Sequence, residues 1–390
     1  MHPTNPWLSR SAKLLVAATF CLIFLGGMVT SKNAGLSVPD WPTSYGYNMF
    51  TFPIERWVGG IFFEHTHRLL ATCVGMMTAV LVAWIWRNRF ALHVALVVCV
   101  LATAAAFISV SHIGSLAGPD QALTRGLIVM HVNIWSFALA FVGGLLTTER
   151  DRWRYGQPWL QWLAFGAFLL VCVQGTLGGL RVTEVSIVLA MIHACTGQAF
   201  LCLTVVMAAA LSPYWNENAD PQPALPAAVA IKPLAWTLVG AVYCQLMIGA
   251  VMRHLHAGLS IPDFPLAFGR LIPPMLNERV AIHFAHRAGA LVVTLLVIAL
   301  TTLVFVAARR CMRLTRAAIG LIGAVILQIV LGAYVIWSQR NPDITSLHVV
   351  NGAVVLGTAL LLAMRATRLK TLSQPQSQSW TQAQYQQARA

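Results

Sequence analysis

The sequence AGLSVPDWP at residues 34–42 recurs as AGLSIPDFP at residues 257–265, with only conservative changes. In both copies a His-Arg pair follows, His67-Arg68 in the first and His286-Arg287 in the second. A long apolar segment comes after each pair. A repeat of this length indicates a tandem duplication, in which each copy builds the same kind of structural unit.

The composition is typical of a membrane protein. Of the 390 residues, 58% are hydrophobic and 10% are charged, and the mean hydropathy is +0.70. A spanning helix needs about 20 mostly apolar residues. Ten segments meet that requirement: residues 14–30, 69–86, 91–110, 126–146, 159–180, 187–211, 234–252, 288–308, 317–337 and 347–364. The sequence therefore predicts an all-α polytopic membrane protein with about ten transmembrane helices.

A second set of markers supports the duplication. Gln174 precedes His193 at almost the same spacing at which Gln328 precedes His348. An unrelated helix would rarely reproduce this spacing, so we expect His193 and His348 to occupy equivalent positions in the two copies.

The copies differ in length between their markers. The interval from His67 to Gln174 is much longer than the interval from His286 to Gln328. The excess of about 65 residues is the length of two membrane helices with their loops, which predicts a helical hairpin inserted at residues 91–155. A hairpin preserves the direction of the chain. We therefore expect two four-helix bundles related by a pseudo-two-fold axis along the membrane normal.

This organisation divides the chain into four parts. Residues 1–212 form the first repeat with its inserted hairpin, and residues 234–370 form the second repeat. Residues 213–233, which contain five prolines, are expected to be a cytoplasmic linker. Residues 371–390 are rich in Gln and Ser and are expected to be a disordered tail.

The net charge of +14 reflects basic residues at alternate helix ends, not a nucleic-acid-binding patch. These residues are Arg10, Lys13, Arg87, Arg89, Arg150, Arg152, Arg154, Arg309, Arg310, Arg313, Arg316, Arg365, Arg368 and Lys370. By the positive-inside rule they place both termini in the cytoplasm. We expect a multi-pass protein of the cell inner membrane with no nucleic-acid partner.

Four histidines occupy the matched positions: His67, His193, His286 and His348. A histidine within a membrane segment is energetically costly and indicates function, although a single one can serve as a helix–helix hydrogen bond. Two histidines in each half are what bis-imidazole ligation of one heme per half requires. The sequence therefore predicts two heme-iron sites near the outer surface.

The halves differ beside their first histidine. Glu64 stands three residues before His67, whereas His283 stands three residues before His286. The spacing places Glu64 on the same helix face as His67, where a carboxylate is able to act as a base or to stabilise positive charge. This difference predicts a catalytic first half and a cofactor-holding second half. The alternative is an interfacial glutamate in water.

Arg68 and Arg287 follow the first histidine of each half. Each is a candidate to neutralise heme propionates, because a guanidinium binds carboxylates in a bidentate manner. Ordinary anchoring at the membrane interface is the alternative for both.

Other histidines carry weaker signals. The roles of four near the same surface stay open: His65, His254, His256 and His283. His112 and His131 lie in the inserted segment without counterparts in the second half, so ordinary packing is the favoured interpretation. The eight cysteines lie in or at the end of apolar segments without a CxxC motif, which argues against a disulfide framework.

At these residues the chain resembles the heme A synthase family, over residues 26–88 and 159–364. The specific features are Glu64-x-x-His67-Arg68, the Gln174-Gly175-x-x-Gly178-Gly179 stretch before His193, His286-Arg287, and His348. The resemblance implies oxidation of the C8 methyl of heme O to a formyl group, giving heme A for cytochrome oxidase.

The resemblance also implies roles for these residues. His67 and His193 would flank the substrate heme with Glu64 essential, and His286 and His348 would ligate a heme b that passes electrons. It implies heme O as substrate and the lipid bilayer as surroundings. Heme O synthase, cytochrome oxidase assembly factors and a second copy of the chain are candidate partners.

The chain departs from the family pattern in two ways. Some members carry a cysteine pair in the outer loop after the first helix, but residues 32–60 contain no cysteine. A mechanism that uses thiols of that loop is therefore excluded. The family usually has eight helices, whereas this sequence predicts ten, so the role of residues 91–155 stays open.

Two other functions compete. A diheme cytochrome b that exchanges electrons with quinone explains the four histidines but not Glu64. A transporter built from repeats is disfavoured, because transporter sites lie near the bilayer midplane and these polar residues lie at helix ends.

Overall fold

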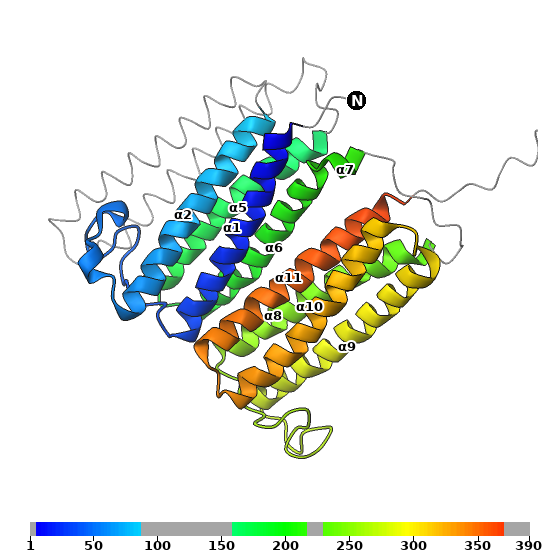
Figure 1. The fold of residues 1–390 in the computed structure, drawn as a ribbon. Coiled ribbons are helices and arrows are strands. Elements are labelled where there is room, and N and C mark those ends of the chain that lie inside the picture. The colour runs from blue at the N-terminus through cyan, green and yellow to red at the C-terminus, as the bar shows by residue number, and fades with distance from the viewer. Residues whose placement is uncertain (1–4, 87–157, 217–228, 370–390) are drawn as a thin grey trace, which may run out of the picture.

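The computed structural model describes residues 5–86, 158–216 and 229–369 (Figure 1). Regular structure in these ranges is helical, apart from two isolated β-bridges in loops. Eight helices are long and apolar enough to cross a membrane. They are α1 (Pro6–Ser31), α2 (Gly59–Ile85), α5 (Pro158–Thr183), α6 (Ile187–Ala210), α8 (Ile231–His254), α9 (Glu278–Ala307), α10 (Met312–Trp337) and α11 (Pro342–Thr367). The prediction of an all-α polytopic membrane protein is confirmed.

The count of ten helices is not tested by these ranges. The expected segments at residues 91–110 and 126–146, and with them the hairpin at residues 91–155, lie outside the described residues. The expected tail at residues 371–390 lies outside them as well. No disulfide joins cysteines within the described ranges.

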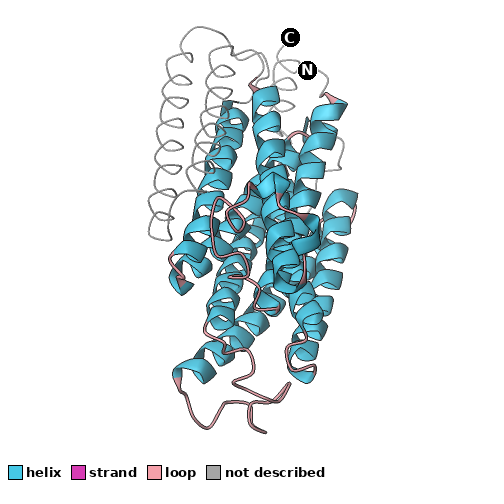
Figure 2. Ribbon diagram, turned by 90° about the vertical axis from the view of Figure 1, so that its left-hand side faces the viewer, coloured by secondary structure: helices cyan, strands magenta, loops and turns pink. Residues whose placement is uncertain are grey.

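The long helices form two groups of four that run side by side along one axis (Figures 1 and 2). In the first group α1 packs on α2, α2 on α5, α5 on α6 and α6 on α1. In the second group α8, α9, α10 and α11 pack in the same cyclic order. Each group has its own buried apolar core. The described helices therefore make two complete four-helix bundles.

The two bundles meet along α1, α6, α8 and α11. Helix α11 packs on α1 and on α6, and α6 also packs on α8. A third apolar cluster, which includes Leu201 of α6 and Leu360 of α11, fills this contact. Helix α11 is the most buried of the eight, because it packs within its own bundle and against the other bundle.

Asparagine and serine caps fix where several helices begin. The side chain of Asn277 accepts a hydrogen bond from the backbone of Val280 at the start of α9. Asn341 caps α11 in the same way, with Pro342 at the first helical position, where its missing N–H is not needed. Ser186 caps α6. These caps set the positions of the histidines that follow them.

Several helices begin earlier than the apolar segments predict. Helix α2 begins at Gly59, not residue 69, and α9 begins at Glu278, not residue 288. Hydropathy misses these first turns because they carry polar side chains that pack against an adjoining loop. Similarly, α8 begins at Ile231 and the short α7 spans Pro213–Asn216, so helix occupies both ends of the range expected as a linker.

Two long loops lie at the same end of the molecule, residues 32–58 after α1 and residues 255–277 after α8 (Figure 1). The first contains two short 3-10 helices, η1 (Met49–Thr51) and η2 (Ile54–Arg56). Both contain one isolated antiparallel bridge, Ser44 to Tyr47 and Ala267 to Arg270. Helix α1 begins and α11 ends at the opposite end.

Candidate functional site

The four marker histidines lie near the loop end of four helices. His67 and His286 are each the ninth residue of their helix, α2 and α9. His193 and His348 are each the seventh residue, of α6 and α11. Matching helix starts therefore bring all four imidazoles to the same depth, two in each bundle.

In the second bundle the imidazoles of His286 and His348 lie near each other in an edge-to-face arrangement. Their ring centroids are 6.4 Å apart and their planes are inclined by 69°. A metal–imidazole bond of about 2 Å on each side of one iron would place the centroids about 6 Å apart. The spacing therefore fits two axial ligands of a single heme iron.

In the first bundle His67 and His193 are close enough to interact electrostatically. They come from α2 and α6, the counterparts in chain order of α9 and α11. Within the described residues, no three His, Cys, Asp or Glu side chains converge as a mononuclear metal site would need. A pair of histidines in each bundle is suited to ligation of one heme iron by two imidazoles.

Each of the four imidazoles lies against a glycine of the neighbouring helix. The pairs are Gly26 with His67, Gly178 with His193, Gly249 with His286, and Gly332 with His348. A Cβ atom at these glycines would lie 3.1, 3.1, 2.9 and 3.1 Å from the imidazole Cε1. The glycines thus form a cradle that fixes each ring, as a metal ligand needs. Gly26 and Gly249 were not found by sequence reasoning, although each lies on the helix before its histidine, at a similar interval in both copies.

Gly178→Ala is expected to disturb the first site, because its methyl group would crowd His193. Overpacking of this kind costs about 1–3 kcal/mol, so heme retention at that site should fall about tenfold. The measurement is heme content per chain by absorption after detergent washing. Gly175→Ala, on the same helix with nothing within 4 Å of its Cβ, is the control. Equal retention in both variants would contradict the cradle.

Glutamine side chains hold three of the four histidine backbones. The Nε2 of Gln245 donates to the carbonyl of His286 at 2.7 Å. Gln174 donates to the carbonyl of His193 at 3.2 Å, and Gln328 donates to that of His348 at 3.1 Å. The markers Gln174 and Gln328 therefore tie the helix before each histidine to the histidine itself.

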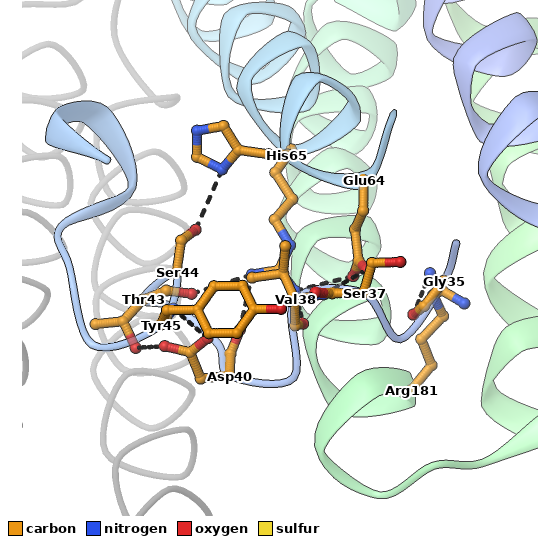
Figure 3. Close-up of polar contacts among 11 residues, drawn as sticks. Gly35, Ser37, Val38, Asp40, Thr43, Ser44, Tyr45, Glu64, His65 and Arg181 are labelled. Atoms are coloured by element: carbon orange, nitrogen blue, oxygen red, sulfur yellow. Dashed lines mark hydrogen bonds and ion pairs between the residues drawn. The ribbon is translucent and has the colours of Figure 1, made fainter. Parts of the chain in front are cut away.

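Glu64 is buried, with a 2% exposed side chain, so the alternative of an interfacial glutamate in water is wrong. One carboxylate oxygen accepts from the backbone N–H of Val38 at 2.9 Å. The other pairs with Arg68 at 3.0 Å, the one ion pair within the described part of the chain. Figure 3 shows Glu64 reaching from α2 to Val38 in the loop.

Arg68 is directed at the loop as well. Its Nη1 donates to the carbonyls of Asp40 and Thr43, and its Nη2 donates to that of Val38. Both terminal nitrogens are thus occupied by the protein. Its predicted role as a propionate ligand stays a prediction, and the contacts present are those of a loop anchor.

The second bundle repeats these contacts with different chemistry. Nδ1 of His283 accepts from the backbone N–H of Ile261 at 3.2 Å, and its Nε2 lies 3.2 Å from Nε of Arg287. Arg287 also donates to the carbonyls of Ile261 and Leu266. Glu64 and His283 therefore hold equivalent loops, and a carboxylate replaces an imidazole only in the first bundle.

An aspartate closes the turn in each loop. Asp40 accepts from the backbones of Tyr45 and Gly46, and Asp263 accepts from Phe268 and Gly269. The Gly269 N–H, followed by that of Phe268, lowers the pKa of Asp263. Because the folded pKa is depressed, this turn is stabilised at neutral pH and loses that stabilisation as the pH falls through the pKa of Asp263.

His65, whose role the sequence left open, lies beneath the first loop. Its Nδ1 is 3.2 Å from the hydroxyl of Ser44 (Figure 3), and its ring packs against Phe52 and Trp57. It belongs to the loop's packing, not to the histidine pair. His131 and His112 lie outside the described residues.

Two arginines near the pairs were not found by sequence reasoning. Arg181 at the end of α5 is close enough to both His67 and His193 to interact electrostatically, and Arg253 at the end of α8 acts on His348 in the same way. Neither belongs to a repeated motif, so no repeat signal indicated them.

Comparisons with known proteins show the family of the chain. A family model, COX15-CtaA, described as cytochrome oxidase assembly protein, matches residues 122–360. A relative from Symbiobacterium thermophilum named heme A synthase is 30% identical over 213 residues, covering 50% of this chain and 68% of the relative. A protein of the same name from Halalkalibacterium halodurans is 25% identical, covering 75% of this chain and 76% of the relative. A third, from Rhodopseudomonas palustris, is 30% identical and covers 56% and 64%.

Proposed function

Because the chain belongs to the COX15-CtaA family of cytochrome oxidase assembly proteins, we propose that its two bundles divide the work of making heme A from heme O. The chain is a membrane oxidoreductase of the heme A synthase family. In our proposal the first bundle holds the substrate, heme O, between His67 and His193. The second bundle holds a heme b between His286 and His348.

The second bundle is suited to a resident cofactor. The 6.4 Å spacing of His286 and His348 and the glycines behind both rings support two fixed axial ligands. A heme with both axial positions filled supplies one-electron transfer and leaves no open position for substrate. His286 and His348 would hold that heme, while Arg287 and His283 hold the loop beside it.

One difference between the bundles supports a catalytic role for the first. Glu64 holds the first loop, whereas His283 holds the second loop from the equivalent position. Glu64 places a buried negative charge three residues from His67, next to the proposed substrate site. A carboxylate in a site shielded from water is able to accept a proton or to stabilise developing positive charge. The neutral imidazole of His283 offers no such charge.

The two bundles are, in our proposal, a tandem repeat with a pseudo-two-fold axis along the membrane normal. Such an axis exchanges α1 with α8 and α6 with α11. It therefore converts the α1–α11 contact into the α8–α6 contact and leaves the α6–α11 contact unchanged. Equivalent loops, histidine positions and glycines support the same relation. The first repeat would be residues 1–212 with the insert 91–155, and the second would be residues 234–370.

Charge supports an orientation with both termini in the cytoplasm of the cell inner membrane. All seven acidic residues of the described ranges lie at the end that carries the two long loops: Asp40, Glu55, Glu64, Glu184, Asp263, Glu278 and Asp343. The opposite end carries a cluster of basic residues, including Arg309, Arg313 and Arg365. By the positive-inside rule the basic end is cytoplasmic.

The proposal also implies partners. Heme O is the substrate, and the lipid bilayer surrounds the helices. Heme O synthase would deliver heme O, and cytochrome oxidase assembly factors would receive heme A. A second copy of the chain is a further candidate partner. The competing function, a diheme cytochrome b, needs no carboxylate beside one of its hemes and is not favoured by the family match.

The proposal is tested by expressing the chain with a heme O source in cells that lack their own heme A synthase. Pigments extracted from the membranes are separated and identified by their absorption spectra. We expect heme A to appear only when the chain is present. Bound heme b without any heme A would instead support the electron carrier.

A further inference from the structure

Three side chains gather where the two bundles meet at their loop ends: Arg181 of α5, and His254 and Arg253 of α8. Arg181 and Arg253 both interact electrostatically with His254, which also interacts with His193. Arg181 reaches the His67–His193 pair, and Arg253 reaches His348. We call these three residues the interbundle seam, in which the two arginines carry positive charge. It runs from one histidine pair to the other.

Arg253 crosses from the second bundle to the first. Its Nη2 donates to the carbonyl of Gly27 and to the hydroxyl of Ser31, both on α1 and both at 2.6 Å. Ser31 in turn lies 3.1 Å from Ser346 of α11. The guanidinium is thus fixed between the bundles, one residue along α1 from the glycine that supports His67.

Arg181 is held in a comparable way. Its Nη2 donates to the carbonyl of Gly35 at 3.3 Å (Figure 3). A Cβ at Gly35 would lie 2.9 Å from Nη1 of Arg181, so the guanidinium rests directly on the backbone. Its nearest acidic group is Glu64, and Glu64 is already bound by Arg68 and Val38.

Both guanidinium groups keep unused donors. Among the described residues, Nε and Nη1 of Arg253 and of Arg181 have no hydrogen-bond partner, and neither residue forms an ion pair. Charged groups inside a membrane pair with an opposite charge or with backbone carbonyls, and the carbonyl and hydroxyl contacts here leave each guanidinium without an opposite charge. A carboxylate from a bound molecule would supply it, because the guanidinium fork matches a carboxylate.

Arg181 and Arg253 differ in their free donors from Arg68 and Arg287, the two arginines of the repeated motif. Arg68 and Arg287 each use both terminal nitrogens on loop carbonyls, whereas Arg181 and Arg253 each use only Nη2. Heme carries two carboxylates, its propionates, on one edge. A heme held by either histidine pair with that edge toward the seam would bring its carboxylates to a free guanidinium.

We propose that Arg181 and Arg253 bind the heme propionates of the first and second sites respectively, so that both hemes turn their propionate edges toward the seam. This inference rests on the proposed function, since it requires heme at both histidine pairs. If both propionate edges face the seam, the two hemes would be nearest to each other at these edges, and electrons would pass between them there.

The test compares hemin with hemin dimethyl ester, in which both carboxylates are blocked. The full-length chain is purified from heme-depleted cells and titrated with each compound, following the low-spin bis-histidine absorption. His67→Ala isolates the second site and His348→Ala isolates the first. These two variants are the parents for the next step. In each parent we expect the ester to bind at least about tenfold more weakly than hemin, as the loss of a charge-assisted hydrogen bond implies.

Adding Arg253→Gln should remove this preference at the second site, and Arg181→Gln should remove it at the first. Arg253→Lys, which keeps the charge, should preserve part of it. Arg270→Gln is the control, because Arg270 is exposed on the second loop and its loss changes the net charge equally. A general loss of folding would lower the amount of low-spin complex with hemin and with the ester alike, so the ratio is compared among variants that bind the same maximum amount of heme per chain as their parent.

An Arg253→Gln or Arg181→Gln variant that keeps the parent's full preference for hemin would overturn the inference. A parent that forms no low-spin complex with either compound would instead refute the proposed function, so the two failures are distinguishable.

Discussion

Replacing Glu64 by histidine is expected to leave both sites able to hold heme but to abolish heme A formation. Histidine is the residue that the second bundle uses at the equivalent position, where one ring nitrogen of His283 accepts from a loop N–H and the other lies beside Arg287. A histidine at position 64 is therefore expected to keep contacts with the first loop, while the carboxylate is lost. Removing a general base or a charge of this kind lowers rates by about 10²–10⁴.

The measurement is heme A per chain, beside the low-spin heme b signal, in cells supplied with heme O. Glu64→Ala should lose heme A too, but it leaves Val38 and Arg68 without their partner and is therefore less informative. The reciprocal variant His283→Glu is the control and should still make heme A. Normal heme A output from Glu64→His would show that Glu64 serves only to hold the loop.

His193→Ala is expected to abolish heme A formation, whereas His131→Ala should be close to the unmodified chain. If helices are counted from the N-terminus, the fourth predicted segment is residues 126–146, which contains His131. This count would make His131 the partner of His67. The spacing from Gln174 to His193, which nearly equals that from Gln328 to His348, selects His193 instead. In the structure His193 is close enough to His67 to interact with it electrostatically.

Heme A output of the two variants is compared at equal amounts of chain in the membrane. An inactive His131→Ala variant beside an active His193→Ala variant would mean that the substrate heme is held differently. The first site would then have to be redrawn around the segment at residues 91–155.

Much of the fold was predictable because membrane helices leave a strong local signal. A run of apolar residues can satisfy its backbone only as a helix in lipid, so hydropathy located all eight described spans. The repeated nonapeptide and the Gln-to-His spacing led to the four histidines. These features depend on residues close together in the chain.

The starts of α2 and α9 were missed because polar residues such as Glu64, His67 and Arg68 lower the local hydropathy. Only the loop that folds back on them makes these turns part of the buried helix. The hydrogen bonds from Arg68 to the carbonyls of a loop that is distant in sequence were not predicted either. No local pattern encodes that contact.

Arg181 and Arg253 could not be predicted for a related reason. They stand at the ends of α5 and α8, outside the repeated motifs, and resemble ordinary interfacial anchors. Their proximity to the histidine pairs arises only when the two bundles pack. Gly26 and Gly249 are similar, since a glycine in a membrane helix is common and its role appears only once an imidazole lies against it.

The central claim is that one bundle holds heme b and the other holds heme O during its conversion. The most direct test is to quantify every heme species per chain in the purified protein from cells that make heme O, with and without His348→Ala. We predict about one heme b per chain in the unmodified protein, together with heme O and heme A. In His348→Ala we predict loss of heme b with heme O retained. Two molecules of heme b per chain and no heme O, or loss of heme O instead of heme b in the variant, would contradict the account.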